Sequence, residues 1–188
     1  PRLAAAPGGG AGAISSIFAT REMLKHHSDS LDVHSEVLTG PLVSDEEMQE
    51  VMKRAEGLPV QVHKFMPSTS EFFAHADLVV ATAGYNTVTQ IFQYAKRAIL
   101  IPRVLYRREQ LVRARRLEEL GLVGCLHPMD ISPKRLAEAL TRALEETSEP
   151  LAVARSRGTL PLNGAERFAE HCGEFQIDVA TEGTKARA

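Results

Sequence analysis

The sequence predicts an α/β fold, a Rossmann-like three-layer domain with a mostly parallel sheet of about six strands. Two observations lead to this fold class. Short apolar runs recur along the chain, and their length and β-branched content are typical of strands buried on both faces. A polar or glycine-rich loop and then a stretch of helical periodicity follow most of these runs. Such alternation of strand and helix is typical of a parallel sheet with right-handed crossovers.

The first half of the chain is expected to alternate strands with helices, in the order strand 3–6, helix from 14, strand 33–39, helix 45–56, strand 60–63 and helix 68–76. A glycine-rich loop at 7–12 separates the first strand from the first helix. Ser44 precedes three acidic residues and is expected to cap the second helix, which Gly57 ends. Phe72 and Phe73 lie on the third helix, and we expect both rings to pack into the core.

The stretch from Asp77 to Arg116 is the centre of the predicted domain. A buried strand at 78–81 breaks at Ala83-Gly84 into a helix, and a second buried strand at 98–101 ends at Pro102. The remaining elements are expected in the order helix 107–120, edge strand 123–126, helix 133–146 and a short helix 164–172, which Asn163 caps. The apolar positions of the first of these helices are Leu111, Val112, Leu117 and Leu120.

Two polar loops follow the strands of this central unit at their carboxyl ends, which is where parallel sheets bind ligands. The first loop starts a helix with Gly84, Tyr85, Asn86 and Thr87, and the free backbone N–H groups of a helix start favour an anion. The second loop and the helix after it hold a set of charged and amide side chains: Arg103, Arg107, Arg108, Glu109, Gln110 and Arg113. Together the two loops indicate a pocket for a phosphorylated, hydroxyl-rich ligand.

Arginines are concentrated around the second loop, at positions 97, 103, 107, 108, 113, 115 and 116. A cluster of this kind is typical either of a solvated helix face or of an anion site, and the residues alone leave both interpretations open. The glycine loop at 7–12 is similarly open, because glycines serve both flexible linkers and phosphate-binding turns.

Composition sets limits on the function. The formal net charge of −2 gives no global field that would favour nucleic acid as a partner. Cys125 and Cys172 lack metal-ligand or redox spacing, which indicates packing roles in a reducing compartment. No apolar run approaches the roughly 20 residues of a membrane span, and no signal peptide is visible. We therefore expect a cytoplasmic domain without a metal site or cofactor.

Several motifs of the central unit resemble a known family. The runs ADLVV, GYNTVTQ, AILIPR, REQLVRA and LEELGL are similar to the C-terminal, donor-binding domain of GT-B glycosyltransferases. The resemblance is strongest to the family that includes the bacterial transferase that adds N-acetylglucosamine to the lipid-linked peptidoglycan precursor. Within it, the chain resembles a group of predicted glycosyltransferases with GYNT and EQxxRA motifs. The resemblance covers residues 2–145.

The resemblance implies a role for each matching residue in binding a nucleotide sugar. The glycines Gly8, Gly9, Gly10 and Gly12 would lie under the diphosphate, and Gly84, Tyr85, Asn86 and Thr87 would donate to the phosphates. The backbone of Phe65 and Met66 would bind the edge of the base, normally uracil. Gln90 would hold the ribose, Glu109 and Gln110 would bind the sugar hydroxyls, and Arg113 stands where an asparagine is common.

Two departures from the family matter. Gln90 takes the place of a glutamate, so one donor and one acceptor replace a charged acceptor pair; Arg103 and Arg113 could compensate by adding charge near the phosphates. The family's N-terminal acceptor domain, which usually supplies the general base, is not in this sequence. We therefore expect residues 1–172 to form the donor-binding domain and residues 173–188 a flexible tail.

The expected function is transfer of a hexosyl group from a UDP-sugar to a lipid-linked or small-molecule acceptor, possible only with an N-terminal domain or partner subunit. A lipid-linked acceptor would bring the domain to the inner face of the membrane. Three alternatives remain: a non-catalytic nucleotide-sugar-binding or scaffolding module, half of a nucleotide-sugar 2-epimerase, and an NAD-binding domain. The sequence disfavours an NAD-binding domain, because the second strand does not end in the acidic residue that would bind the ribose of NAD.

Overall fold

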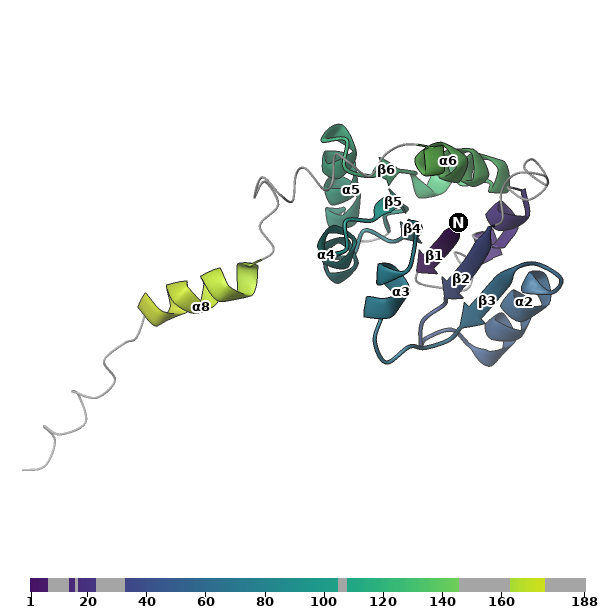
Figure 1. Cartoon of the computed structure of the whole chain (residues 1–188), viewed down its shortest axis with the longest axis horizontal. Coiled ribbons are helices and arrows are strands. Elements are labelled where there is room, and N and C mark those ends of the chain that lie inside the picture. The colour runs from purple at the N-terminus through teal and green to yellow at the C-terminus, as the bar shows by residue number, and fades with distance from the viewer. Residues whose placement is uncertain (7–13, 16, 23–32, 105–107, 146–162, 175–188) are drawn as a thin grey trace, which may run out of the picture.

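A computed structural model describes residues 1–6, 14–15, 17–22, 33–104, 108–145 and 163–174 of the chain (Figure 1). Within them lies a six-stranded sheet whose paired strands all run parallel, in the order β3-β2-β1-β4-β5-β6. The strands are β1 (Arg2–Ala6), β2 (His34–Leu38), β3 (Val60–His63), β4 (Leu78–Ala81), β5 (Arg97–Leu100) and β6 (Gly124–Cys125). The predicted α/β class and parallel sheet are therefore confirmed.

Helices lie on both faces of the sheet, as the three-layer prediction requires (Figure 1). One core cluster joins one face of the strands to residues of α2 (Asp45–Ala55) and α6 (Pro133–Glu145) and to the helical residue Ile17. The second cluster joins the other face to α3 (Ser70–Ala74), α4 (Tyr85–Gln93) and α5 (Glu109–Glu119). A 3₁₀ turn, η1 (Pro128–Asp130), precedes α6.

The central strand β4 shows why a continuous apolar run marks a parallel strand. All four of its residues are buried, with Leu78 and Val80 in one core cluster and Val79 and Ala81 in the other. Phe72 and Phe73 are also buried, and their rings meet edge to face with centroids 5.4 Å apart. The predicted inward packing of both aromatics is confirmed.

The predicted apolar face of α5 was right at Leu117, partly right at Leu111 and wrong at Val112 and Leu120. Val112 is 65% exposed and Leu120 is 53% exposed, whereas Ala114 is fully buried and Leu117 nearly so. The helix contacts the sheet through a stripe that includes Ala114, and side chains on the opposite side of such a stripe reach solvent. A small alanine gave too weak a hydrophobic signal to place the stripe correctly.

The two cysteines differ in their surroundings. Cys125 is partly buried at the β6 edge, where burial and the Glu118 carboxylate raise the pKa of its thiol. Cys172 is exposed on α8 (Gly164–Glu174), so its predicted packing role was wrong. The described side chains of α8 are exposed throughout, and Figure 1 shows this helix apart from the sheet. The predicted tail lies, from residue 175 on, outside the described residues, and the division at residue 172 stays a prediction.

None of the helices in the described ranges is long and apolar enough to cross a membrane.

The start of α2 yields a first testable prediction. Ser44 Oγ accepts a hydrogen bond from the Glu47 N–H at 3.1 Å, and the Glu47 carboxylate accepts one from the Ser44 N–H at 3.0 Å. Ser44→Ala should therefore lower the free energy of unfolding by about 1 kcal/mol, and Ser44→Gly by only a few tenths. Urea denaturation measures both variants. An unchanged free energy of unfolding in the alanine variant would contradict this role of the side chain.

Candidate functional site

The strand order places a topological switch point between β1 and β4. Chain connections leave these two neighbouring strands in opposite directions across the sheet, and ligands of open α/β sheets bind at the carboxyl ends of such strands. The turn from β4 to α4 lies at this point. The loop after β1, with the predicted site residues Gly8, Gly9, Gly10 and Gly12, lies outside the described residues.

Gly84 is the N-cap of α4 and has no conformational need to be glycine. Its φ of −62° and ψ of 149° are ordinary extended values. Among the described residues, and apart from chain neighbours, the one atom within 4 Å of an added Cβ would be Thr87 Oγ1, at 3.7 Å. The described structure thus leaves room beside Gly84. A glycine here is useful if a ligand has to approach the backbone closely.

The N-terminus of α4 is set apart from those of the other described helices, α2, α3, α5, α6 and α8. Each of those has an acidic residue in its first turn or a serine that accepts from a first-turn N–H. In α4 the first turn has no acidic residue and no side chain caps it. The first intrahelical donor is the Val88 N–H, which donates to the Gly84 carbonyl at 3.0 Å, so the N–H groups of Tyr85, Asn86 and Thr87 precede the helical ladder. This end of α4 therefore offers its positive dipole to an external anion.

Arg113 reaches this turn from α5. Its Nη1 donates to the Ala83 carbonyl at 2.6 Å, and its guanidinium lies over the Tyr85 ring, 6.0 Å from the centroid. Tyr85 itself is 69% exposed. The contact places a cation beside the α4 N-terminus.

Gln90 lies in the second turn of α4 and is partly buried. Its Oε1 accepts a hydrogen bond from Thr69 Oγ1 at 3.0 Å, which leaves the amide N–H₂ as its remaining donor. Thr69 ends the loop that starts after β3 at the same carboxyl edge. That loop also carries Phe65, which is 65% exposed, and Met66, which packs on the core. The hydrogen bond from Thr69 to Gln90 thus connects the loop that carries Phe65 and Met66, the predicted base-binding segment, to α4. Sequence reasoning missed Thr69, and no local pattern marks it.

Gln110 has a comparable internal contact. Its Oε1 accepts from the Arg103 N–H at 3.0 Å, which ties the start of α5 to the loop after β5. Its amide N–H₂ is left as a donor. Glu109 and Arg103 are exposed on the same edge. The structure therefore places Arg103 and Gln110 in contact at the carboxyl end of β5, and Arg113 further along α5 in contact with the β4–α4 turn.

The arginine cluster does not form one surface. Arg97 donates from Nη1 to the Ala143 and Leu144 carbonyls, at 3.2 and 2.7 Å, and so stabilises the end of α6. Arg116 pairs with Glu119 on the exposed side of α5. Of the arginines described in this region, Arg103 and Arg113 are those with a contact at the carboxyl edge of β4 and β5.

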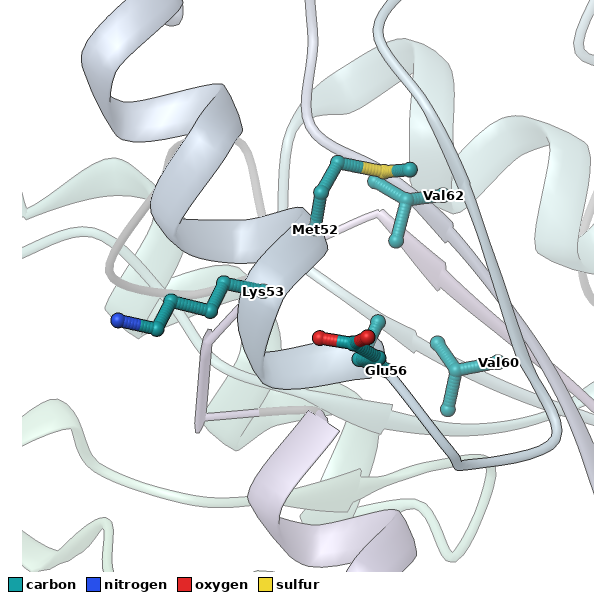
Figure 2. Close-up of a pocket in the computed structure, with 6 residues that line it drawn as sticks. Met52, Lys53, Glu56, Val60 and Val62 are labelled. Atoms are coloured by element: carbon teal, nitrogen blue, oxygen red, sulfur yellow. The ribbon is translucent and has the colours of Figure 1, made fainter.

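Two hollows lie away from this edge. One, of about 410 Å³, lies between α2 and β3, and Figure 2 shows Met52, Val60 and Val62 around it while the Lys53 ammonium points outward. The other, of about 590 Å³, lies at the amino ends of β1, β2 and β3. Neither contains a predicted site residue. Across the described ranges, no three His, Cys, Asp or Glu side chains are grouped as a metal site would need.

Comparison with known proteins identifies the family. Residues 8–171 match the glycosyltransferase family 28 C-terminal domain. A relative from Haemophilus influenzae (strain PittEE), UDP-N-acetylglucosamine–N-acetylmuramyl-(pentapeptide) pyrophosphoryl-undecaprenol N-acetylglucosamine transferase, is 27% identical over 164 residues, which are 87% of this chain and 45% of the relative. The chain thus spans less than half of that protein.

Two solved structures show the same fold. MurG of Acinetobacter baumannii superposes with a TM-score of 0.71 at 17% identity, over 92% of this chain and 49% of that one. The glycosyltransferase VinC, solved in complex with DTDP, gives a TM-score of 0.65 at 19% identity, over 93% and 42%. These likenesses and the sequence match agree with the resemblance in the motifs. The chain belongs to glycosyltransferase family 28 and carries its C-terminal domain, one part of a GT-B transferase.

Proposed function

We propose that this domain binds the nucleoside-diphosphate sugar, specifically a UDP-sugar, from which the transferase takes a hexosyl group. The uncapped N-terminus of α4 at the switch point is the observation that carries the proposal. Its N–H groups suit phosphate oxygens, and the room beside Gly84 suits close approach. Arg113 adds a positive charge there.

The chemistry that follows is displacement at the anomeric carbon of the sugar. The bond from that carbon to the diphosphate breaks as the acceptor hydroxyl attacks, and the nucleoside diphosphate leaves. Negative charge builds on its β-phosphate in the transition state. Donors fixed at that place before the reaction lower the barrier, and we assign this work to the N–H groups of Tyr85, Asn86 and Thr87 together with Arg103.

The remaining parts of the donor are assigned along the same edge. Backbone groups of Phe65 and Met66 bind the base, and Gln90 contacts the ribose. Glu109 and Gln110 bind hydroxyls of the transferred sugar, since they start α5 next to the loop after β5. In this arrangement the ligand runs from the end of β3 to the start of α5, and the loop at 7–12 lies under its diphosphate.

The acceptor and the general base come from another half of the transferase in this proposal. The chain covers 45% of its Haemophilus influenzae relative, so the rest of that protein has no counterpart here. An N-terminal domain or a partner subunit supplies it. If the acceptor is lipid-linked, as the relative's name states for that protein, transfer takes place at the cytoplasmic face of the membrane.

Calorimetric titration of this chain with UDP, UDP-N-acetylglucosamine, dTDP and NAD tests the proposal. We expect UDP and UDP-N-acetylglucosamine to bind with a dissociation constant on the order of micromolar, equivalent to about −8 kcal/mol, dTDP to bind more weakly, and NAD not to bind. Binding of NAD in their place, or of none of the diphosphates, would contradict it.

Gln90→Glu tests the ribose assignment. A carboxylate keeps the acceptor for Thr69 Oγ1 and replaces the amide donor by a second, charged acceptor for the ribose hydroxyls. We expect UDP to bind the same or up to about tenfold more tightly, which corresponds to about 1.4 kcal/mol, near the lower end of what one charge-assisted hydrogen bond contributes. Titration with 2′-deoxy-UDP is the control, because the gain should shrink without the 2′-hydroxyl. A marked loss of UDP affinity would place the ribose elsewhere.

A further inference from the structure

We propose that Arg113 is a positioning residue for the phosphate-binding turn between β4 and α4. It acts from α5 through the Ala83 carbonyl and the Tyr85 ring, and not by contacting the phosphates itself. The inference rests on the proposed function, because it concerns how the turn is held ready for the diphosphate.

The two contacts of Arg113 lie on either side of Gly84. Ala83, whose carbonyl accepts from Nη1, comes directly before this glycine, and Tyr85, whose ring lies against the guanidinium, comes directly after it. A planar guanidinium can satisfy both contacts at once, since it donates at its edge while its face stacks on a ring. One side chain therefore restrains the backbone on both sides of the glycine to which the ligand is expected to come closest.

Among the described residues, this restraint adds to the burial of Ala83 and to the hydrogen bond that Thr89 Oγ1 donates to the Tyr85 carbonyl at 3.0 Å. No side chain caps α4, and Gly84 brings no packing of its own. A glycine in such a place gains conformational freedom unless neighbouring contacts limit it. The contact from α5 limits it, so the N–H groups of Tyr85, Asn86 and Thr87 converge before a ligand arrives. Preorganised donors bind an anion more tightly, because less ordering remains to be done on binding.

No carboxylate of the described residues neutralises the charge of Arg113, so this charge can act on an anion at the turn. In the described structure Arg54, Arg116 and Arg135 have carboxylate partners, whereas Arg113, although partly buried, has only the neutral carbonyl and the ring. A partly buried cation without a carboxylate partner lowers the stability of the fold, so stability by itself does not explain its presence. Beside a helix N-terminus it raises the positive potential that a diphosphate meets.

Binding measurements with three variants test the role. Arg113→Met removes the charge and the donors but keeps an unbranched apolar stem; we expect UDP affinity to fall about tenfold or more and uridine affinity to stay unchanged. Arg113→Lys keeps a charge and one donor but not the planar stack, so it should restore part of the loss. Arg116→Met, one turn along α5 at an exposed ion pair, is the matched control and should bind UDP as the unaltered chain does.

A double-mutant cycle separates positioning from direct contact with the ligand. If Arg113 acts through Tyr85, then Arg113→Met should cost much less in a Tyr85→Leu background than in the unaltered chain. Equal losses in both backgrounds would mean that Arg113 does not act through the Tyr85 ring, which would overturn the proposal as stated. Unchanged UDP affinity in a folded Arg113→Met variant would overturn it as well.

Hydrogen exchange tests the positioning role without any ligand. The Val88 N–H, which donates to the Gly84 carbonyl, should exchange several-fold faster in Arg113→Met and at an unchanged rate in Arg116→Met. If the unaltered chain binds no nucleotide but this exchange differs as expected, the positioning role stands and the proposed function fails. If it binds UDP but the exchange rates are equal, the function stands and the positioning role fails.

Discussion

Gly84→Val is expected to lower the affinity for UDP by about 100-fold, equivalent to about 2.7 kcal/mol of binding free energy. A branched side chain beside the α4 N-terminus would hold the diphosphate away from the N–H groups of Tyr85, Asn86 and Thr87. Hydrogen bonds to a charged group contribute about 1.5–3 kcal/mol each, so the loss of one or two of them accounts for the effect. Titration calorimetry measures it directly.

The fold should survive this substitution. The φ of Gly84 lies outside the left-handed region, and an added Cβ would meet Thr87 Oγ1 at an ordinary contact distance of 3.7 Å. Valine is a poorer N-cap than glycine, so a loss of about 1 kcal/mol in unfolding free energy is expected. Gly164→Val, at an open glycine that starts α8, is the control and should leave UDP binding unchanged. Normal UDP binding by a folded Gly84→Val variant would remove the turn from the site.

Gln110→Ala is expected to weaken binding of UDP-N-acetylglucosamine by about 30-fold and of UDP by only a few-fold. The larger effect comes from the lost amide donor to a sugar hydroxyl. The smaller one arises because Gln110 Oε1 also accepts from the Arg103 N–H and so holds the loop after β5. Affinities for both ligands, measured side by side, separate the two effects.

Gln110→Glu is the matched variant for this experiment. Its carboxylate can still accept from the Arg103 N–H, but it has no donor for the sugar. UDP affinity should therefore stay close to that of the unaltered chain while affinity for the nucleotide sugar falls. If Gln110→Ala reduces the binding of UDP and of the nucleotide sugar by the same factor, the assignment of Gln110 to the sugar is wrong.

Much of the fold could be predicted because its signals are local. The strands 60–63 and 78–81 agree with β3 and β4 residue for residue, since short apolar runs between turn residues define them. Ser44 and Gly57 bound α2 as expected, and Gly57 has the positive φ of 73° that such a helix end favours. At β5 and β6 each predicted end differs by one residue, where strands give way to irregular backbone.

The contacts that shape the candidate site could not be predicted in this way. Thr69 and Gln90 are 21 residues apart, and Arg113 is 30 residues from Ala83, so only the packing of α3, α4 and α5 brings them together. The same packing separates the arginines of the cluster: Arg97 contacts the end of α6, and Arg116 lies at the surface. The sequence showed that arginines are concentrated in this region, but it did not show which element each arginine contacts.

The position of β1 has a consequence for how the domain folds. It is the first strand of the chain and yet pairs with β2 on one side and with β4 on the other, and its Arg2 N–H donates to an Asp77 oxygen 75 residues away. Pairing over such separations raises contact order and slows folding, because a long loop must close before the contact stabilises anything. During synthesis β1 emerges before β4, so this pairing can form only after the residues between them have been made. Removing even a few residues at its start would take away the middle of the sheet and not an edge.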